Sequence, residues 1–285
     1  MSVLLIGVNY RTDDHAIGFA KSLAQYPSSD ISVVLVDNSE KSDFTFFLDR
    51  IAEVNPEVRC IAAPKNLGYF GGANYGLNFY LENRSIPDWI IVCNVDIEFC
   101  DPNFFEHLHE LKNVPNLGVI APCIWSIRWQ KDLNPKMVQR PAKKKMQFYK
   151  LIFDHYYVQN FYELLSFFKS GIRAWKARIF TSSTSEQPKP QADAPIYAPH
   201  GSCMIFHRRY LESGANLAYS VFLFGEEIFV AEACKDAGLM VMHCPVLSVL
   251  DKEHASTGII RSRRVAGYMK DATNYLLENY FAQAE

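Results

Sequence analysis

The sequence predicts a doubly wound α/β fold, in which helices cover both faces of a mainly parallel sheet. Three observations lead to this prediction. Short, nearly continuous apolar runs rich in β-branched residues recur through the first 125 residues, stretches of helical character separate them, and polar or glycine-rich motifs follow directly after several of the runs. Ligands of such sheets bind at the carboxyl ends of the strands, so these motifs are the expected functional residues.

The elements follow one another as repeated strand–helix units. The predicted strands of the first part are Val3–Val8, Ile31–Val36, Val58–Ile61, Trp89–Cys93 and Gly118–Ala121, with helices at about residues 14–25, 43–53, 72–83 and 102–112. The last third adds a strand that ends at Phe206, a helix over Glu226–Ala237, a strand over Met240–Val246 and a terminal helix over Lys270–Phe281.

Composition describes an ordinary globular protein. The chain has 285 residues, of which 49% are hydrophobic, with a formal charge of −2, and this length can bury a sizeable core without disulfides or metal ions. The near-neutral balance disfavours a duplex-binding protein. Seven scattered cysteines, no basic leader before the apolar Met1–Val8 and no apolar run of about 18 residues together predict a cytoplasmic protein.

The middle of the chain has a different character. Residues 125–178 contain twelve Lys and Arg against three Asp and Glu, together with many aromatic residues. An amphipathic helix is predicted between Met146 and Ser170, followed by a polar, flexible connector over Thr181–Pro195. Such a segment can lie on an anionic membrane surface, or pack on its own domain or a second copy in a homodimer; nothing else favours contact with nucleic acid.

Three motifs follow the second, third and fourth strands. A carboxylate at Asp37 can accept hydrogen bonds from a nucleobase N–H or a ribose hydroxyl, or close an Asx turn. The glycine-rich stretch 64–76 lets backbone approach a ligand at a helix N-terminus, which favours phosphate. Asp96, in Asn94-Val95-Asp96, stands where an apolar strand opens to solvent and could hold a divalent cation on a diphosphate.

Two further motifs lie in the last third. Glu226 and Glu227 begin a helix among aromatic residues, where a carboxylate can act as a general base or simply cap the helix. The loop from Asp251 to Gly258 gathers charges, hydroxyls and His254, a possible metal ligand.

Taken in order, these motifs resemble those of glycosyltransferase family 2, which has the GT-A fold, from Ser2 to about Gly258. The stretch Asn66-Leu-Gly-Tyr-Phe-Gly-Gly-Ala-Asn74 resembles the segment along the donor, Asn94-Val95-Asp96 stands for the Asp-x-Asp metal motif, and Glu226-Glu227 matches the position of the catalytic base. His200-Gly201-Ser202-Cys203-Met204 resembles the segment near the acceptor.

The resemblance implies a three-layer α/β/α enzyme with a basic helical insertion, which carries out an inverting, metal-dependent transfer from a nucleoside-diphosphate sugar. Its residues would be Glu227, or Glu226, as the base, Gly201 and Ser202 on the acceptor side, and Asp96 on Mn²⁺ or Mg²⁺. The further protein contact to the metal would be Asp251, His254 or neither. The nucleotide-binding residues would be Asn9, Asp37, Asn66, Gly68, Asn74 and Asn94.

Small bacterial relatives of this layout are often rhamnosyltransferases of surface polysaccharide synthesis, so the expected donor is a UDP- or dTDP-sugar and the expected acceptor a lipid-linked glycan. This places the protein in the cytoplasm or peripherally on the inner face of the membrane. The resemblance divides the chain into a nucleotide-sugar-binding half (1–124), the insertion and linker (125–195), an acceptor half (196–260) and a terminal helix (261–285).

Two alternatives remain. A sugar-phosphate nucleotidyltransferase shares acids at strand ends, but carries a basic, glycine-rich phosphate loop after its first strand, which Val8-Asn9-Tyr10-Arg11-Thr12 does not supply. A non-catalytic partner in a polysaccharide assembly complex would keep the fold and bind nucleotide or lipid only. Asn94 in place of an Asp, and Asp251 where many relatives have His, leave that possibility open.

Overall fold

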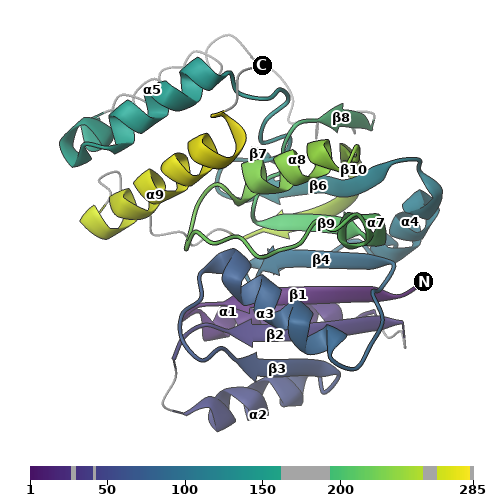
Figure 1. Cartoon of the computed structure of the whole chain (residues 1–285). Coiled ribbons are helices and arrows are strands. Elements are labelled where there is room, and N and C mark those ends of the chain that lie inside the picture. The colour runs from purple at the N-terminus through teal and green to yellow at the C-terminus, as the bar shows by residue number, and fades with distance from the viewer. Residues whose placement is uncertain (27–29, 41–42, 162–192, 253–261, 283–285) are drawn as a thin grey trace, which may run out of the picture. The chain divides into compact units, whose positions relative to one another are not determined.

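The computed structural model describes residues 1–26, 30–40, 43–161, 193–252 and 262–282 (Figure 1). These residues form two compact units. The first contains residues 1–140, 193–222 and 226–252, and the second contains residues 141–161, 223–225 and 262–282. Within the described residues, no helix is long and apolar enough to cross a membrane.

The first unit is built on one mixed sheet. Its described strands are β1 (Val3–Asn9), β2 (Ile31–Asp37), β3 (Val58–Ala62), β4 (Trp89–Asn94), β5 (Ile97–Glu98), β6 (Leu117–Ser126), β7 (Lys131–Asp132), β8 (Ala194–Ile196), β9 (Cys203–His207) and β10 (Met240–Asp251). The order across the sheet is β3-β2-β1-β4-β9-β6-β10-β5, with β7 beside β6 and β8 beside β10.

Strand direction decides which ends meet. The neighbours β3, β2, β1 and β4 are parallel, β9 is antiparallel to both β4 and β6, and β6 is parallel to β10. The carboxyl ends of β1, β2, β3, β4, β6 and β10 therefore share one edge of the sheet with the beginning of β9. We call this the carboxyl edge; in Figure 1 the N-terminus marks the opposite edge, where β1 begins.

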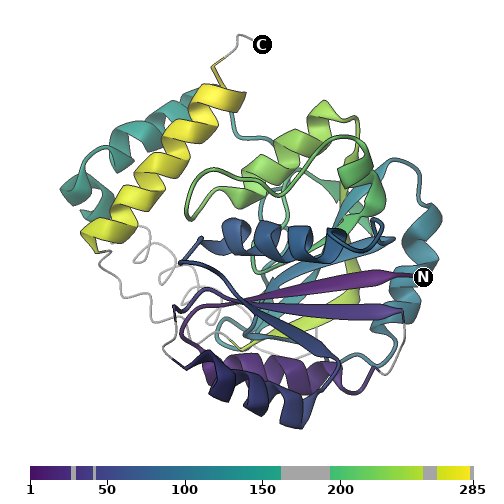
Figure 2. The same ribbon diagram turned by 60° about the horizontal axis from the view of Figure 1, so that its bottom comes forward.

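Helices cover both faces of this sheet (Figure 2). They are α1 (Asp13–Leu23), α2 (Phe44–Val54), α3 (Tyr69–Leu81), α4 (Phe104–Glu110), the 3₁₀ helix η1 (Leu111–Asn113), α7 (Arg208–Glu212) and α8 (Glu226–Asp236). Two glycines identify the faces, because a Cβ on Gly7 would meet Phe19 of α1, whereas one on Gly76 of α3 would meet Ile6 and Val36. Consecutive strand residues point to opposite faces, so each face has its own apolar layer. The predicted three-layer α/β/α architecture is confirmed.

The second unit contains α5 (Lys143–Phe153) and α9 (Arg263–Tyr280), which pack against each other. The expectation of a single helix from Met146 to Ser170 is wrong within the described residues. Helix α5 ends at Phe153, and a new helical stretch starts at residue 156. The Asp154 carboxylate at this break contacts both Lys150 and Lys270. Residues 162–170 and most of the Thr181–Pro195 connector lie outside the described residues.

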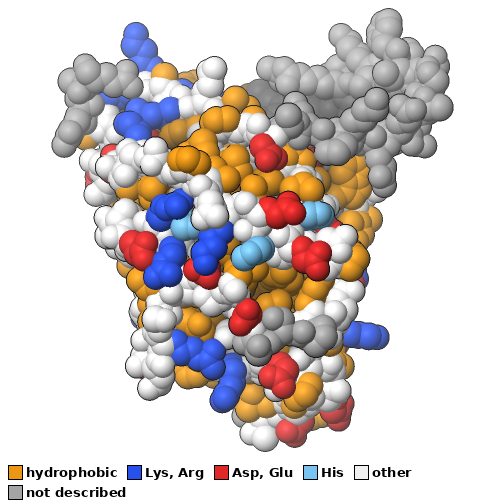
Figure 3. All heavy atoms as spheres, turned by 90° about the vertical axis from the view of Figure 1, so that its right-hand side faces the viewer, with side chains coloured by type: hydrophobic (Ala, Val, Ile, Leu, Met, Phe, Trp, Pro, Cys, Tyr) orange, Lys and Arg blue, Asp and Glu red, His pale blue; other side chains and the backbone are white. Residues whose placement is uncertain are grey.

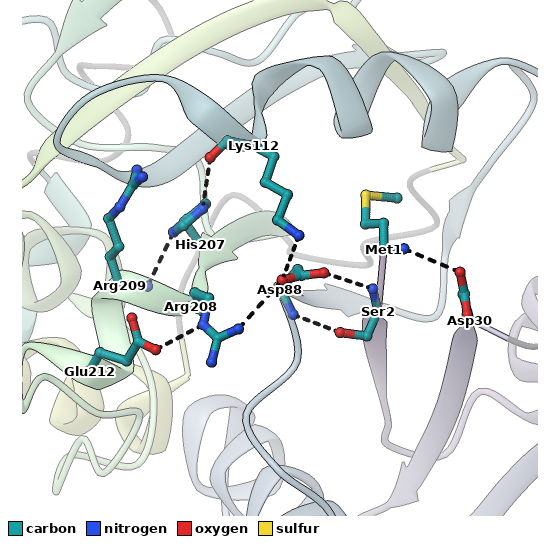
Figure 4. A network of polar contacts seen from close by, with 9 residues as sticks. All are labelled: Met1, Ser2, Asp30, Asp88, Lys112, His207, Arg208, Arg209 and Glu212. Carbon is teal, nitrogen blue, oxygen red and sulfur yellow. Dashed lines mark hydrogen bonds and ion pairs between the residues drawn. The ribbon is translucent and has the colours of Figure 1, made fainter.

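The edge opposite the carboxyl edge is tied together by Asp88 (Figure 4). Its carboxylate accepts a hydrogen bond from the Ser2 amide at 3.0 Å and contacts Lys112 Nζ at 3.1 Å and Arg208 Nη1 at 3.5 Å. Burial alone would raise the pKa of Asp88, but the Ser2 amide and Lys112 outweigh it and lower the pKa below its ordinary value. On this side of the molecule basic and acidic side chains are intermixed (Figure 3), which suits a structural role.

The lowered pKa of Asp88 predicts how the free energy of unfolding of Asp88→Asn depends on pH. A group whose pKa is lowered by folding stabilises the protein above its unfolded pKa, and this contribution is lost as the pH falls through the folded value. We expect Asp88→Asn to lose about 1–2 kcal/mol at pH 7, in the lower part of the range for charged hydrogen bonds because Lys112 and Arg208 reach solvent.

Urea unfolding at pH 7 and below pH 4 measures this difference. The loss should shrink toward zero at the acid end, whereas Asp14→Asn, at an exposed ion pair with Arg50, should change little at either pH. A loss for Asp88→Asn that is equal at both values would contradict the account.

Candidate active site

The carboxyl edge brings the predicted polar residues together. In the strand register, Asn9 of β1 stands beside Asp37 of β2, and Val8 stands beside Asn94 of β4. Three motifs that lie far apart in the sequence therefore occupy neighbouring strand ends. This follows from the parallel pairing of β1 with both β2 and β4.

Asp37 is held by its neighbours. One of its oxygens, Oδ1, accepts hydrogen bonds from Asn9 Nδ2 at 2.9 Å and from Ser39 Oγ at 2.6 Å. Asn9 is in turn fixed by Thr12, whose amide and hydroxyl both donate to Asn9 Oδ1. Asp37 is only 2% exposed, and these bonds offset the cost of burying its charge. Its direct role in this geometry is to fix the loop after β2, and contact with a nucleobase remains a prediction.

The glycine-rich turn before α3 is closely fitted to its surroundings. Gly68 has a φ of +76°, and a Cβ built on it would lie 1.9 Å from the carbonyl oxygen of Phe222. The Gly68 carbonyl accepts a hydrogen bond from Asn38 Nδ2 at 2.8 Å, and its amide donates to Asn66 Oδ1 at 3.0 Å. Helix α3 begins directly afterwards and has no side-chain cap, so its first-turn amides remain available to an anion.

Asn74 lies one turn into α3 and is half-buried. The sequence placed the start of this helix near Gly72, and the structure moves it to Tyr69. Tyr69 itself was missed. Its hydroxyl is buried and has no hydrogen-bond partner among the described residues, and burial raises its pKa, with further contributions from Glu226 and Asp96. Tyr69 is therefore a protonated donor close to both acids.

The residues at the end of β4 are hydrogen-bonded to two other segments, the one before β9 and the one after β10. The Asn94 amide donates to the Ser202 carbonyl at 3.0 Å, and the carbonyl of Asp96 accepts from the Lys252 amide at 3.2 Å. Asp251 lies opposite Ile97 in the pairing of β10 with β5, so Asp96 and Asp251 belong to adjacent segments. Asp96 is half-buried and Asp251 is buried. His254 lies outside the described residues, which contain no group of three His, Cys, Asp or Glu side chains able to hold a metal ion.

Glu227 is directed at Gly201, in the segment that the sequence predicts to lie near the acceptor. A Cβ on Gly201 would lie 3.3 Å from Glu227 Oε1, so the carboxylate rests against the backbone of this glycine. Glu226 is almost fully buried, whereas Glu227 keeps 17% of its side chain exposed. Of the two acids, Glu227 is the better placed to meet a substrate.

Four residues on or near α8 were not identified from the sequence. Lys136 Nζ lies 3.9 Å from Glu227 Oε1. Farther along the helix, Arg140 makes a two-point contact with Glu232, at 2.7 and 3.2 Å, and the Tyr197 hydroxyl donates to the same carboxylate. Glu232 is 2% exposed, so this network fixes the orientation of α8 and with it Glu227. The only signal in the sequence was Glu232, a Glu on the buried face of the predicted helix, and such a residue cannot be told from a surface acid by sequence alone.

His200 is a neutral polar residue at the same place. Its Nδ1 lies 2.9 Å from Ser202 Oγ, and its amide donates to Asn134 Oδ1 at 2.7 Å. Burial, and then Lys136, lower the pKa of His200 to about 3. The imidazole is therefore uncharged at neutral pH and helps to hold the Gly201-Ser202 backbone in place.

Comparison with known proteins identifies the fold and the family. In solved structures, the fold is that of GT-A glycosyltransferases. A mannosyltransferase of Pyrobaculum calidifontis in complex with GDP-Man and Mn²⁺ matches with a TM-score of 0.50 and 12% identity, over 99% of this chain and 76% of that one. GalNAc-T7 with UDP, GalNAc and Mn²⁺ matches with a TM-score of 0.59 and 11% identity, over 99% of this chain and 49% of that one.

Sequence comparison gives the family. The profile of Glycosyl transferase family 2 matches residues 18–213, and the chain belongs to this family. A relative in Mycobacterium tuberculosis, an N-acetylglucosaminyl-diphospho-decaprenol L-rhamnosyltransferase, is 20% identical over 97% of this chain and 84% of its own length. The family resemblance and fold predicted from the motifs are confirmed, and the match favours a glycosyltransferase over the nucleotidyltransferase alternative.

The fit around Gly68 can be tested by Gly68→Ala. A Cβ would both clash with the Phe222 carbonyl and require a left-handed backbone, so we expect a loss of about 3 kcal/mol or more in the free energy of unfolding.

Gly214→Ala is the matched control, because Gly214 has a φ of +91° but no atom within 4 Å of its Cβ position. It should cost only about 1 kcal/mol, the penalty of the backbone conformation alone. Equal losses for the two variants in urea unfolding would show that the Phe222 contact is unimportant.

Proposed function

We propose that this protein is an inverting, metal-dependent glycosyltransferase that moves a sugar from a nucleoside-diphosphate sugar to a hydroxyl of a lipid-linked glycan. The position of Glu227 carries the proposal. Its carboxylate rests against Gly201, and the next residue, Ser202, binds the amide of Asn94 at the end of β4. A candidate base thus stands beside the strand end that bears Asp96. Membership of glycosyltransferase family 2 and the similarity to a rhamnosyltransferase support it.

The proposed reaction is a single displacement. Glu227 takes the proton from the acceptor hydroxyl as its oxygen forms a bond to the anomeric carbon of the donor sugar. The bond from this carbon to the diphosphate oxygen breaks on the opposite face, so the configuration inverts and the nucleoside diphosphate leaves with the electron pair. Glu226 is too deeply buried for this role in the present geometry.

The donor would lie along the carboxyl edge. We assign its nucleoside to the Asn9–Asp37 pair and its diphosphate to the backbone at Asn66 and Gly68, the start of α3, Asn74 and Asn94. The amides of α3 and the close backbone approach at Gly68 favour an anion there. A UDP- or dTDP-sugar is the proposed donor, by analogy with the family.

A divalent cation fits the residues at this place. Asp96 has a buried carboxylate oxygen at the edge of the sheet. With no third protein ligand among the described residues, diphosphate oxygens would complete the coordination, as is usual for Mg²⁺ and Mn²⁺ on nucleotides. When bound, the ion would neutralise charge on the leaving diphosphate. Asp251 is a candidate second ligand, and structures similar to this one contain Mn²⁺.

Glu227→Gln tests the assignment of the base. We expect kcat for transfer to fall by about 100-fold or more, the usual effect of losing a general base, with unchanged affinity for the nucleoside diphosphate. In Glu226→Gln, at the adjacent position, kcat should fall much less. The rates are measured as nucleotide release from UDP-, dTDP- and GDP-sugars in the presence of acceptor and Mn²⁺. Asp96→Ala should abolish the Mn²⁺-dependent release.

The outcomes separate the alternatives. If Glu227→Gln retains full activity, Glu227 is not the base. If the wild-type protein binds a nucleoside diphosphate but transfers no sugar from any donor to a lipid-linked acceptor, the protein is instead a non-catalytic binding partner.

The second unit supports a peripheral position on an anionic membrane. On α5, Phe148 and Leu151 are 52% and 67% exposed, and Tyr157, Val158 and Phe161 continue the exposed apolar surface. Lys144 and Lys145, at the start of the helix, make no ion pair with any described residue. Exposed apolar and aromatic side chains beside lysines without an acidic partner among the described residues are suited to the interface of an anionic bilayer, where a lipid-linked acceptor resides. We place the enzyme on the inner face of the cytoplasmic membrane.

Vesicle co-sedimentation tests this surface with Phe148→Ser/Leu151→Ser. On vesicles rich in phosphatidylglycerol, the double variant should bind several-fold less than wild type, because two interfacial side chains are lost. Phe46→Ser is the matched control, since Phe46 is 62% exposed on α2 of the first unit. Undiminished vesicle binding of the double variant would contradict the proposal. If the double variant instead changes from dimer to monomer, the surface binds a second copy of the chain.

A further inference from the structure

The loop after β7 brings two lysines to the acceptor side of the carboxyl edge. Strand β7 pairs with the end of β6, with Lys131 opposite Ser126. Lys136 follows five residues later. Neither residue stood out from the sequence among the many basic residues of this region.

Asn134 fixes this loop against the acceptor-side segment. Its Nδ2 donates to the Pro122 carbonyl at 2.8 Å, and its Oδ1 accepts from the His200 amide at 2.7 Å. Its own amide donates to Asp132 Oδ1 at 2.9 Å, and Asp132 also contacts His243 at 3.0 Å. Asn134 is buried, so the loop backbone is a rigid support for the two lysines that flank it.

The two ammonium groups have little to neutralise them. Lys136 Nζ lies 3.9 Å from Glu227 Oε1, at the outer limit of an ion pair, and 40% of its side chain is exposed. Lys131 is exposed and makes no ion pair or side-chain hydrogen bond with any described residue. Burial is the main cause of the lowered pKa of His200. The charges of Lys136 and Lys131 lower this pKa further, against the opposite effect of Asp132, so both lysine charges act on the segment that contains Gly201 and Ser202. A bound anion would neutralise the charges of Lys131 and Lys136.

We propose that Lys131 and Lys136 bind the diphosphate of the acceptor, and that the enzyme therefore recognises a sugar linked through diphosphate to a lipid. This inference rests on the proposed function, because Glu227 must meet the acceptor hydroxyl. In an acceptor whose first sugar carries that hydroxyl, one hexose ring separates it from the diphosphate. A hydroxyl held at Glu227 consequently places the diphosphate within the reach of the flexible Lys136 side chain.

The chemistry suits lysine. An ammonium group is a mobile point charge with three donors, and it can follow a diphosphate that must also leave with its lipid. The donor diphosphate has its own place, at Asp96 and the start of α3. Lys131 and Lys136 come from β7 and the loop after it, whereas Asp96 follows β4, so we assign the two diphosphates to separate residues.

The test compares two acceptors that differ only in the anion. One is the acceptor sugar on a short polyprenyl diphosphate, and the other is the same sugar on an uncharged alkyl chain. For Lys131→Ala and Lys136→Ala, KM for the diphosphate acceptor should rise about 10-fold or more, the cost of a lost charged hydrogen bond. KM for the alkyl glycoside should change less than about 2-fold, since this acceptor has no anion for either lysine to contact. Affinity for the nucleoside diphosphate should not change.

Controls separate binding from positioning. Lys136→Arg should restore most of the affinity for the diphosphate acceptor, because it retains the charge. Lys21→Ala, which removes an exposed lysine of α1, should behave as wild type toward both acceptors. Lys131→Ala is the more direct test of anion binding, because Lys131 makes no contact with Glu227.

The inference is overturned if both acceptors lose activity equally in the variants, which would assign Lys136 to the positioning of Glu227, or if neither is affected. A wild-type enzyme that transfers sugar with equal KM to both acceptors would also overturn it while leaving the proposed function intact. A wild-type enzyme that transfers to neither, from any donor, would remove the proposed function itself.

Discussion

The antiparallel insertion of β9 between β4 and β6 is the constraint on which the candidate site depends. Because β9 runs against its neighbours, the residues that precede it arrive at the edge where β4 and β6 end. The Gly201-Ser202 backbone is thereby bonded to Asn94 on one side and, through His200, to Asn134 on the other. Glu227 then rests on Gly201. The proposed donor and acceptor elements are thus joined by the backbone hydrogen bond from Asn94 to Ser202, which belongs to the fold itself.

Most of the elements could be predicted from the sequence, since each central strand is a short apolar run between polar or glycine residues. The boundaries that were wrong have physical causes. Helix α3 starts at Tyr69 because Gly68 already turns the chain with a positive φ, and α5 ends at Phe153, just before an Asp154 that contacts two lysines. Helix α9 begins at Arg263, where the Ser262 side chain caps it, seven residues before the predicted start.

Much of the candidate site could also be predicted, because acids and amides that follow parallel strands must share an edge. The sequence could not show that Asp37 already accepts hydrogen bonds from Asn9 and Ser39. It also could not show that Glu227 is partly exposed whereas Glu226 is buried. Nor could it single out Lys136 or Glu232, whose importance comes from contacts across more than ninety residues of chain. Such contacts leave no local pattern, and they are the ones that orient α8.

Hydrogen–deuterium exchange with a nucleoside diphosphate and Mn²⁺ tests the central claim, that the carboxyl edge is the donor site, most directly. We expect slower exchange in the segments after β1, β2, β3 and β4, and unchanged exchange around Asp88 at the opposite edge. Tight binding without protection of these segments, or with protection centred on Asp88, would contradict it.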